Sequence, residues 1–306
     1  ASAALAELVE VAALHPDAAP TDVAWALLGV GWPRFLSGDI EGGMEAMDGA
    51  ISRFLAVGDR LGASGALAGR GHMELLANAD ADSAADWYER ALAEATALGD
   101  PQATSVVLVD TAQSLILSDR LGEQVGSMLS DAEVALRRAH DHHRLAHLYM
   151  DRLLAAYAVA DLDATTEYAD RTIAESRLAR TDSFAQIAHT ALGVVGLHRG
   201  DLTGALSQLR IAIRMAKDEH NTLQLGIALQ AFAIHRALDD SDADAVWVAA
   251  RSVSPLWPLF ARRYGELIGA ERVAALEAGF ESINAGTSVA PLPLDAAVAL
   301  ALDSPL

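Results

Sequence analysis

The densest group of possible metal ligands is the segment HDHHR at residues 140–144. His140, His142 and His143 could bind a transition metal, because neutral imidazole is a common ligand. His143 and His147 are four residues apart and would share one face of a helix. A structural metal site needs further ligands that this segment does not supply. We therefore interpret the segment as an exposed loop followed by a helix start, and we predict no bound metal.

Other segments resemble ligand-binding loops but lack residues that such loops need. GVGWPR at 29–34 and GRGHME at 69–74 both lack the third glycine of a dinucleotide loop, and neither follows a strand. DADS at 80–83 and DDSDAD at 239–244 lack the glycine and glutamate of a calcium loop. The chain also has no cysteine and no Gly-x-Ser-x-Gly nucleophile turn. We predict no catalytic residue and no cofactor, which favours a binding protein over an enzyme.

The composition limits the partners. The 306 residues include 42 acidic and 22 Lys or Arg residues, which gives a formal net charge of −20. Such a chain repels phosphate backbones, so we expect no direct contact with nucleic acid, and a basic peptide fits better. Glu7 and Glu10 interrupt the apolar N-terminal stretch, which therefore fits neither a signal peptide nor a membrane span. We predict a cytoplasmic protein without membrane contact and, since the chain begins without Met, a fragment of a larger one.

Acidic residues at predicted helix breaks recur with a period near 40 residues. Gly-Asp pairs suit such breaks, because glycine adopts the left-handed conformation that ends a helix and aspartate caps the next helix. Two interleaved series about half a period apart indicate two helices per repeat. The first series is Asp39, Asp80, Asp119, Asp161, Asp201 and Asp240, and the second is Asp59, Asp100, Asp141, Asp182 and Asn221.

These breaks predict an all-α fold of about six antiparallel helix pairs in a right-handed superhelix. We expect an N-terminal helix at 1–20, a repeat array at 21–252 and C-terminal capping helices at 253–306. Pro33 lies inside the first predicted helix and should kink or break it. The predicted pairs are 21–57, 60–98, 101–139, 142–179, 182–219 and 221–252.

The repeats resemble tetratricopeptide repeats, in which small residues let paired helices approach and a larger residue fills the gap. Leu192-Gly193 followed by Ala205, Leu209 and Ala212 carries this pattern. Gly31 with Met47, and Ala84 with Tyr88 and Ala91, repeat it. The period exceeds the 34 residues of the standard repeat, so the expected helices are longer.

The C-terminal region is similar to the ends of actinobacterial signal-transduction ATPases and LuxR-type regulators. The matching residues are Ile268-Gly269-Ala270-Glu271-Arg272, Gly279 and the segment LDAAVALAL at 294–302. Ala296 stands where that family usually has glutamate. The resemblance implies a sensor or scaffold region that acts on an ATPase module, and no phosphate loop or basic helix-turn-helix is present here.

The first helix of each pair should line the concave side of the array. Projecting the frame of Gly193 onto every pair predicts an apolar and aromatic stripe with a few polar groups. Two interpretations are open: a core covered by the N-terminal helix and the C-terminal tail, or a groove for an apolar small molecule or an amphipathic peptide. The predicted binding residues are Trp25, Trp32, Arg70, His72, Gln113, His147, Met150, Tyr157, Thr190 and Gln230.

The segment SPLWPLFARRYG at 254–265 breaks the repeat pattern with two prolines and several large apolar residues. We interpret it as the cap of the last repeat, and a partner-docking patch around Trp257 is the alternative. The leading hypothesis for the whole chain is a non-catalytic sensor or interaction region that binds a small effector or a protein segment. A free-standing peptide-binding scaffold is the second hypothesis and a helical-repeat enzyme the third; a homodimer is compatible with each.

Overall fold

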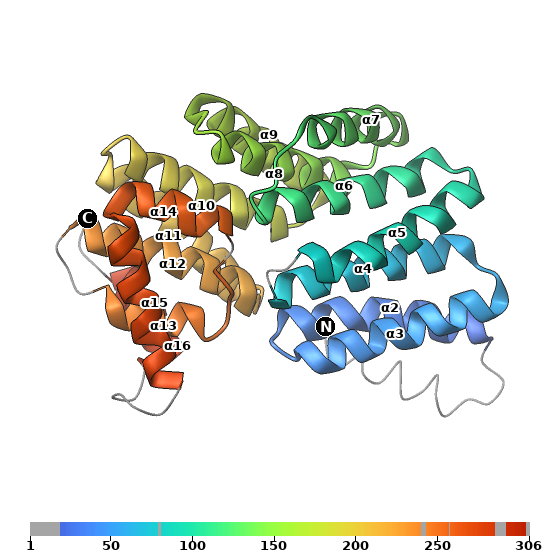
Figure 1. Ribbon diagram of the computed structural model, residues 1–306, viewed down its shortest axis with the longest axis horizontal. Coiled ribbons are helices and arrows are strands. Elements are labelled where there is room, and N and C mark those ends of the chain that lie inside the picture. Colours follow the sequence, from blue (N-terminus) through green and yellow to red (C-terminus); the bar gives the residue numbers. More distant parts are fainter. Residues whose placement is uncertain (1–18, 79–80, 240–242, 257, 285–291, 304–306) are drawn as a thin grey trace. The chain divides into compact units, whose positions relative to one another are not determined.

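The computed structural model describes residues 19–78, 81–239, 243–256, 258–284 and 292–303. Over these residues the chain forms fifteen α-helices and no strand, as the sequence predicts (Figure 1). The predicted N-terminal helix and Trp257 lie outside the described residues. The helices are α2 (Pro20–Leu36), α3 (Ile40–Val57), α4 (Arg60–Asn78), α5 (Ala81–Leu98), α6 (Pro101–Leu117), α7 (Glu123–Ala139), α8 (His142–Ala158), α9 (Leu162–Ala179), α10 (Ser183–His198), α11 (Leu202–Asp218), α12 (Thr222–Leu238), α13 (Asp244–Arg251), α14 (Pro258–Ile268), α15 (Ala270–Asn284) and α16 (Leu294–Asp303).

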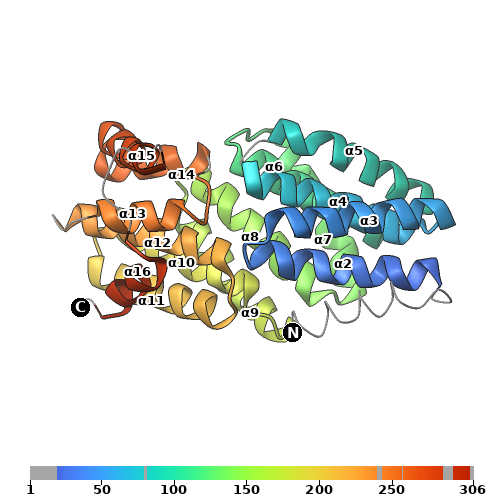
Figure 2. The same ribbon diagram turned by 90° about the horizontal axis from the view of Figure 1, so that it is seen from below.

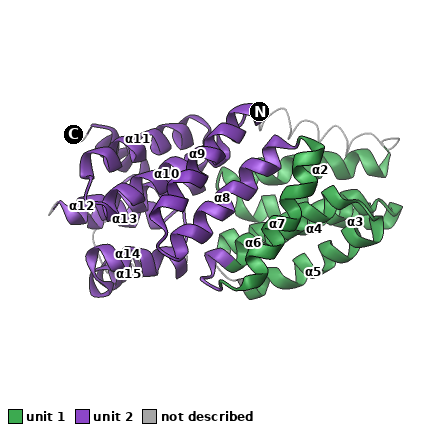
Figure 3. Cartoon of the chain, turned by 90° about the horizontal axis from the view of Figure 1, so that it is seen from above, with its two compact units in different colours: residues 1–115, 121–140 green, residues 116–120, 141–306 purple. Residues whose placement is uncertain are grey.

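Contacts divide the chain into two units (Figure 3). Unit 1 comprises residues 1–115 and 121–140, and unit 2 comprises residues 116–120 and 141–306. The division falls within the predicted array, and the boundary predicted between residues 252 and 253 lies inside unit 2. Among the described helices, none is both long and apolar enough to cross a membrane.

Successive helices pack as antiparallel hairpins within each unit. In unit 1, α2 packs on α3 and α4 on α5; in unit 2, α8 packs on α9 and α10 on α11. The ends of these hairpins agree with the predicted pairs to within about two residues. Pro33 does not break the first helix, because α2 continues past it to Leu36. A proline in the last turn removes only one helical hydrogen bond, so the helix ends soon after it.

One type of turn joins most of the hairpin helices. A residue with positive φ ends one helix, and the next Asp or Asn accepts a hydrogen bond from the backbone N–H three residues later. Gly200 has φ 74°, and Asp201 Oδ1 lies 2.9 Å from the nitrogen of Gly204. The same bond forms at Asp39, Asp59, Asp141, Asp161 and Asn221.

Three residues of the predicted series do not cap a helix in this way. Asp100 accepts its bond from the backbone N–H of Gln102, two residues later, at 2.8 Å. Asp119 itself has φ 56° and ends α6, so it occupies the place of the glycine rather than that of the cap. Asp182 precedes α10 without a side-chain cap bond. Asp80 and Asp240 lie outside the described residues. The spacing therefore located helix ends correctly without fixing the role of each aspartate.

Ala160 should be replaceable by glycine with a gain in stability. It is exposed at φ 64°, where an L residue costs about 1–2 kcal/mol and glycine does not. Glycine also adds conformational entropy to the unfolded chain, which offsets part of this gain. Ala160→Gly should therefore raise the free energy of unfolding by about 0.5–1 kcal/mol in urea titrations. The control Ala174→Gly, at an exposed position inside α9, should lower it by about 1 kcal/mol. Equal effects of the two substitutions would contradict this explanation of the turn.

The predicted small-to-large pairing holds the hairpins together. A Cβ atom placed on Gly193 would lie 2.7 Å from Leu209 Cγ, so only glycine lets α10 and α11 approach so closely. Gly31 faces Met47 in the same way, and the methyl group of Met47 would lie 3.0 Å from an added Cβ. At the equivalent positions of α8 and α9 the sizes are reversed, with Leu153 on the first helix and Ala169 on the second, both fully buried.

Gly193→Ala should destabilise the protein although alanine favours helices. The added methyl group meets the branched end of Leu209, and overpacking of this kind costs about 1–3 kcal/mol. Gly65→Ala is the matched control, because a Cβ there meets nothing within 4 Å. It should raise the free energy of unfolding by up to about 1 kcal/mol. If both variants were stabilised in urea titrations, the close approach of α10 and α11 would not depend on glycine.

The last helices cover the end of unit 2. The hairpin of α12 and α13 carries α14 and α15 on one side and α16 on the other, where α16 also contacts α11 (Figure 2). Glu277 of α15 accepts hydrogen bonds from the Trp247 indole at 2.7 Å and from Arg251 Nε at 2.8 Å. Arg210 Nε of α11 donates to the Ala301 carbonyl of α16 at 3.1 Å. These contacts fix α15 and α16 beside the last hairpins.

Candidate functional site

All ten predicted binding residues lie on the first helices of the hairpins. We call the side of these helices that faces the neighbouring first helices the first-helix face, and each unit has its own. In unit 1 the face belongs to α2, α4 and α6, and in unit 2 to α8, α10 and α12. Unit 1 holds Trp25, Trp32, Arg70, His72 and Gln113, and unit 2 holds His147, Met150, Tyr157, Thr190 and Gln230.

Trp32 and His72 form the centre of the first-helix face in unit 1. Their ring centroids are 5.2 Å apart in an edge-to-face arrangement. The indole of Trp32 lies over Gly69, since Trp32 Nε1 would be 3.3 Å from a Cβ added there. His72 Nδ1 lies 4.0 Å from Asp110 Oδ1 of α6, and the His72 side chain is 14% exposed. Three successive first helices thus contribute an indole, an imidazole and a carboxylate.

Asp110 was not among the predicted residues. The residue predicted on α6 was Gln113, which is buried, as is Asp110. Asp110 lies three residues before Gln113 on nearly the same side of the helix, so a small rotation of the helical frame was enough to miss it. Periodicity predicts which helices contribute to a face more reliably than it predicts which of their side chains lie on it.

Trp25 and Arg70 make their contacts with second helices instead. The Trp25 ring meets Phe54 of α3 edge-on at 4.9 Å. Arg70 Nε lies 3.1 Å from Asp48 of α3, and the Arg70 guanidinium lies 5.0 Å from the ring centroid of Trp87 of α5. The structure does not bring these two predicted residues together with Trp32 and His72.

The first-helix face of unit 2 buries several polar groups. The His147 ring stacks on Phe184 of α10 at 5.0 Å, and His147 Nε2 lies 3.9 Å from Asp151 Oδ2 one turn along α8. The Thr190 hydroxyl donates to the Gln186 carbonyl at 3.0 Å. Met150 is also buried. These groups form part of the interior of unit 2.

Gln230 already holds a segment of the chain. Its side-chain amide donates to the carbonyls of Ser254 at 3.3 Å and Pro255 at 3.1 Å. This pair of bonds fixes the connection that leads from α13 to α14. Gln230, which was predicted to bind a ligand, therefore binds main-chain carbonyl groups of the protein itself.

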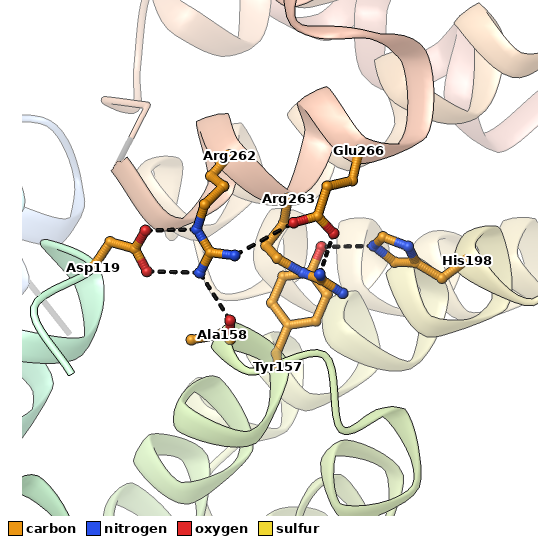
Figure 4. Close-up of polar contacts among 7 residues, drawn as sticks. All are labelled: Asp119, Tyr157, Ala158, His198, Arg262, Arg263 and Glu266. Atoms are coloured by element: carbon orange, nitrogen blue, oxygen red, sulfur yellow. Dashed lines mark hydrogen bonds and ion pairs between the residues drawn. The ribbon is translucent and has the colours of Figure 1, made fainter. Parts of the chain in front are cut away.

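Two arginines of α14 reach Asp119 and the C-terminal end of α8 (Figure 4). Arg262 contacts both carboxylate oxygens of Asp119, from Nε at 2.6 Å and from Nη2 at 2.7 Å. Nη2 also donates to the Ala158 carbonyl at 2.8 Å. Charge-assisted pairs with two parallel bonds are strong and directional. Asp119 thus orients Arg262 over the end of α8.

Arg263 is buried under α14. Its guanidinium lies 4.7 Å from the ring centroid of Tyr157, and it contacts Glu266 one turn along the same helix. The Tyr157 hydroxyl shares a hydrogen bond with His198 Nε2 at 3.2 Å. A cation over an aromatic face is attracted by the ring quadrupole, more strongly where water is excluded.

Burial and neighbouring charges shift the pKa values of three groups in this cluster. Burial raises the pKa of Tyr157, so its phenol stays protonated near neutral pH, although Arg263 opposes the shift. Burial, and next the charge of Arg263, lower the pKa of His198, so its imidazole is neutral. The hydrogen bond to Asp119 raises the pKa of Arg262. Arg262 and Arg263 are therefore paired with Asp119 and Glu266, beside the neutral pair of Tyr157 and His198.

Sequence reasoning identified Tyr157 but not its partners. Asp119 was interpreted as a helix cap, and the segment 254–265, which contains Arg262 and Arg263, as the cap of the last repeat. The adjacent arginines inside an apolar segment were the available signal. The contact between Asp119 and Arg262 spans 143 residues, and no local pattern predicts it.

The histidine-rich segment has structural partners. His142 Nδ1 lies 2.7 Å from Glu175 Oε2 of α9, and the His143 ring meets Phe184 edge-on at 5.1 Å. Burial, and next the charge of Arg144, lower the pKa of His143. In the described part of the chain, this turn presents no group of three ligands close enough to hold a metal.

No protein-family model matches the sequence, and a comparison with curated proteins finds no significant match. The resemblance to the repeat regions of signal-transduction ATPases and LuxR-type regulators thus stays an expectation that rests on the residues quoted for it.

His198 should make stability depend on pH. Its pKa in the folded protein is below the ordinary 6.5, so folding disfavours the protonated imidazole. The stability from this residue is complete above pH 6.5 and is lost as the pH falls below that value. His198→Gln cannot titrate, so its free energy of unfolding should fall less between about pH 7.5 and about pH 5.5 than that of the wild type.

Tyr157→Phe is the control for this prediction. It removes the hydrogen bond to His198 and should lower stability at every pH, while the dependence on pH is retained. His143 and His235 also have pKa values lowered by burial, so His198→Gln should reduce the dependence without abolishing it. Identical slopes for His198→Gln and the wild type would exclude His198 as a contributor.

Proposed function

We propose that this chain is a non-catalytic interaction region that binds a protein segment or a small apolar effector on the first-helix faces of its hairpins. The resemblance of its C-terminal region supports a place within a larger cytoplasmic signal-transduction ATPase or transcriptional regulator. In that setting, the bound segment or effector would bias the activity of a neighbouring module.

The observation that carries the proposal is the seating of α14 in unit 2. This amphipathic helix buries Leu259, Phe260 and Tyr264. Its Arg262 pairs with Asp119, and its Arg263 lies over the ring of Tyr157 of α8. Helix-in-groove binding uses this combination of apolar anchors at helical spacing and a few oriented polar contacts. A face that holds one such helix has the chemistry to hold another.

Unit 1 offers a comparable face with partly exposed groups. Trp32 and His72 lie together on α2 and α4, and Gly29 and Gly65 on the same two helices have nothing within 4 Å of an added Cβ. Aromatic residues beside open backbone give apolar contact area at low cost in side-chain entropy. Trp32 is therefore the residue at which we expect a partner to bind.

The titratable groups around α14 support a role without catalysis. A general acid or base works best with a pKa near the operating pH. The pKa values of Tyr157 and His198 are shifted away from neutrality in opposite directions, the first upward and the second downward. The charged groups of the cluster are bound to one another.

Photocrosslinking in the native host tests the proposal. A benzoylphenylalanine at position 32 replaces one large aromatic side chain with another, and the control places it at Val134, which is exposed on the second helix α7. We expect a defined adduct from position 32 and none from position 134, with native mass spectrometry reporting a co-purified small molecule. If position 32 gives no adduct and no small molecule co-purifies, or if both positions give the same adducts, the first-helix face of unit 1 is not a binding surface.

A further inference from the structure

We propose that α14 is a displaceable internal ligand, and that the surface beneath it is a docking site for a partner helix carrying two adjacent arginines. This inference rests on the proposed function, since it assumes that first-helix faces bind protein segments. It adds the location in unit 2 and the chemical class of the partner.

The surface of unit 2 that α14 covers is shaped to bind a guanidinium group. Asp119 presents both carboxylate oxygens to Nε and Nη2 of Arg262, and the Ala158 carbonyl receives a third bond. This planar arrangement fits the fork of arginine and not the single ammonium group of lysine. Ala158 ends α8, where the helix dipole also favours a cation.

The second arginine position is an aromatic surface. Tyr157 offers its ring to Arg263, and His198 holds the phenol by its hydroxyl group. The carboxylate that pairs with Arg263 is Glu266, which belongs to α14 and would leave with it. The exposed receptor would then carry the Asp119 carboxylate, a helix-end carbonyl and an aromatic ring, all of which attract cations.

The apolar side of α14 defines the rest of the motif. Leu259, Phe260 and Tyr264 are buried, and the Tyr264 ring meets Trp247 of α13 edge-on at 6.3 Å. A matching partner is a helix with two apolar residues, a spacer, two arginines and an aromatic residue. A basic helix also suits a chain with a net charge of −20.

Two features favour exchange of α14 for such a helix. It has 11 residues, and isolated helices of that length are marginal in water. The Arg262 side chain is 39% exposed, so its pair with Asp119 lies within reach of solvent and of a competing guanidinium. Its neighbours stay anchored, by Gln230 before α14 and by Glu277 after it, so α14 acts at the high local concentration of a tethered competitor.

A free peptide with the sequence of residues 255–268, labelled with a fluorophore, is the probe of the partner class. In fluorescence anisotropy it should bind the full chain with Arg262→Ala and Arg263→Ala at least about tenfold more tightly than the wild type, because the tethered competitor is weakened. Arg272→Ala is the matched control, since Arg272 pairs with Asp244 at 3.0 Å elsewhere in the cap and is 42% exposed. It should bind the peptide like the wild type.

Two further measurements test the recognition itself. A peptide with both arginines changed to lysine should lose at least about tenfold in affinity, and Asp119→Asn added to the double variant should have a similar effect. In the wild type, hydrogen exchange of the α14 amides should accelerate when the peptide is in large excess, while that of α15 is unchanged. This experiment needs no substitution and holds even if the double variant does not fold.

The proposal is overturned if the double variant folds but binds no more tightly than Arg272→Ala, or if excess peptide leaves exchange in α14 unchanged. Equal binding of the lysine peptide would contradict guanidinium recognition. A wild-type dimer that the peptide dissociates would assign the site to a second copy of this chain instead. None of these results depends on crosslinking at Trp32, so they can fail while the proposed function of unit 1 holds.

Discussion

The turn that ends one helix and caps the next is the constraint on which the rest of this structure depends. Its first residue takes a left-handed conformation, and the following Asp or Asn accepts a bond from the next helix, as Gly200 and Asp201 do. Both groups satisfy backbone polar atoms that a helix end leaves without partners. The turn reverses the chain, and the next helix must then pack against the one before. Within each unit neighbouring first helices contact one another, as α2 and α4 do in unit 1 and α8, α10 and α12 do in unit 2.

This arrangement explains why the charged cluster of unit 2 lies where it does. The C-terminal ends of the first helices α8 and α10 carry Tyr157, Ala158 and His198. Helix C-termini expose carbonyl groups and carry the negative end of the helix dipole, so they attract cations. Arg262 meets such an end and the carboxylate of Asp119 together. The fold thus produces a cation-binding surface from backbone geometry and one well-placed acidic residue.

The sequence predicted local features well, because their causes are local. Helix ends follow from Gly-Asp pairs and capping residues, and the ends of the described helices agree closely with the predicted ones. The contact of Gly193 with Leu209 was also predictable, since both belong to one hairpin. The direction of a side chain across helices was harder to predict. Arg70 was assigned to the first-helix face, yet it pairs with Asp48 of a second helix. Glycines at 62, 65, 69 and 71 leave α4 without a clear apolar stripe that would fix its register.

The reversal of sizes between two hairpins has a consequence for how such an array can change over time. Gly193 faces Leu209 in one hairpin, while Leu153 and Ala169 occupy the equivalent positions in another. Each hairpin keeps a similar total volume at this position but divides it differently between its helices. A single helix copied from one repeat into another would therefore create either a clash of two leucines or a void between two small residues. At this position an exchange of whole hairpins would keep each pairing, whereas an exchange of single helices would need a compensating substitution in the partner helix.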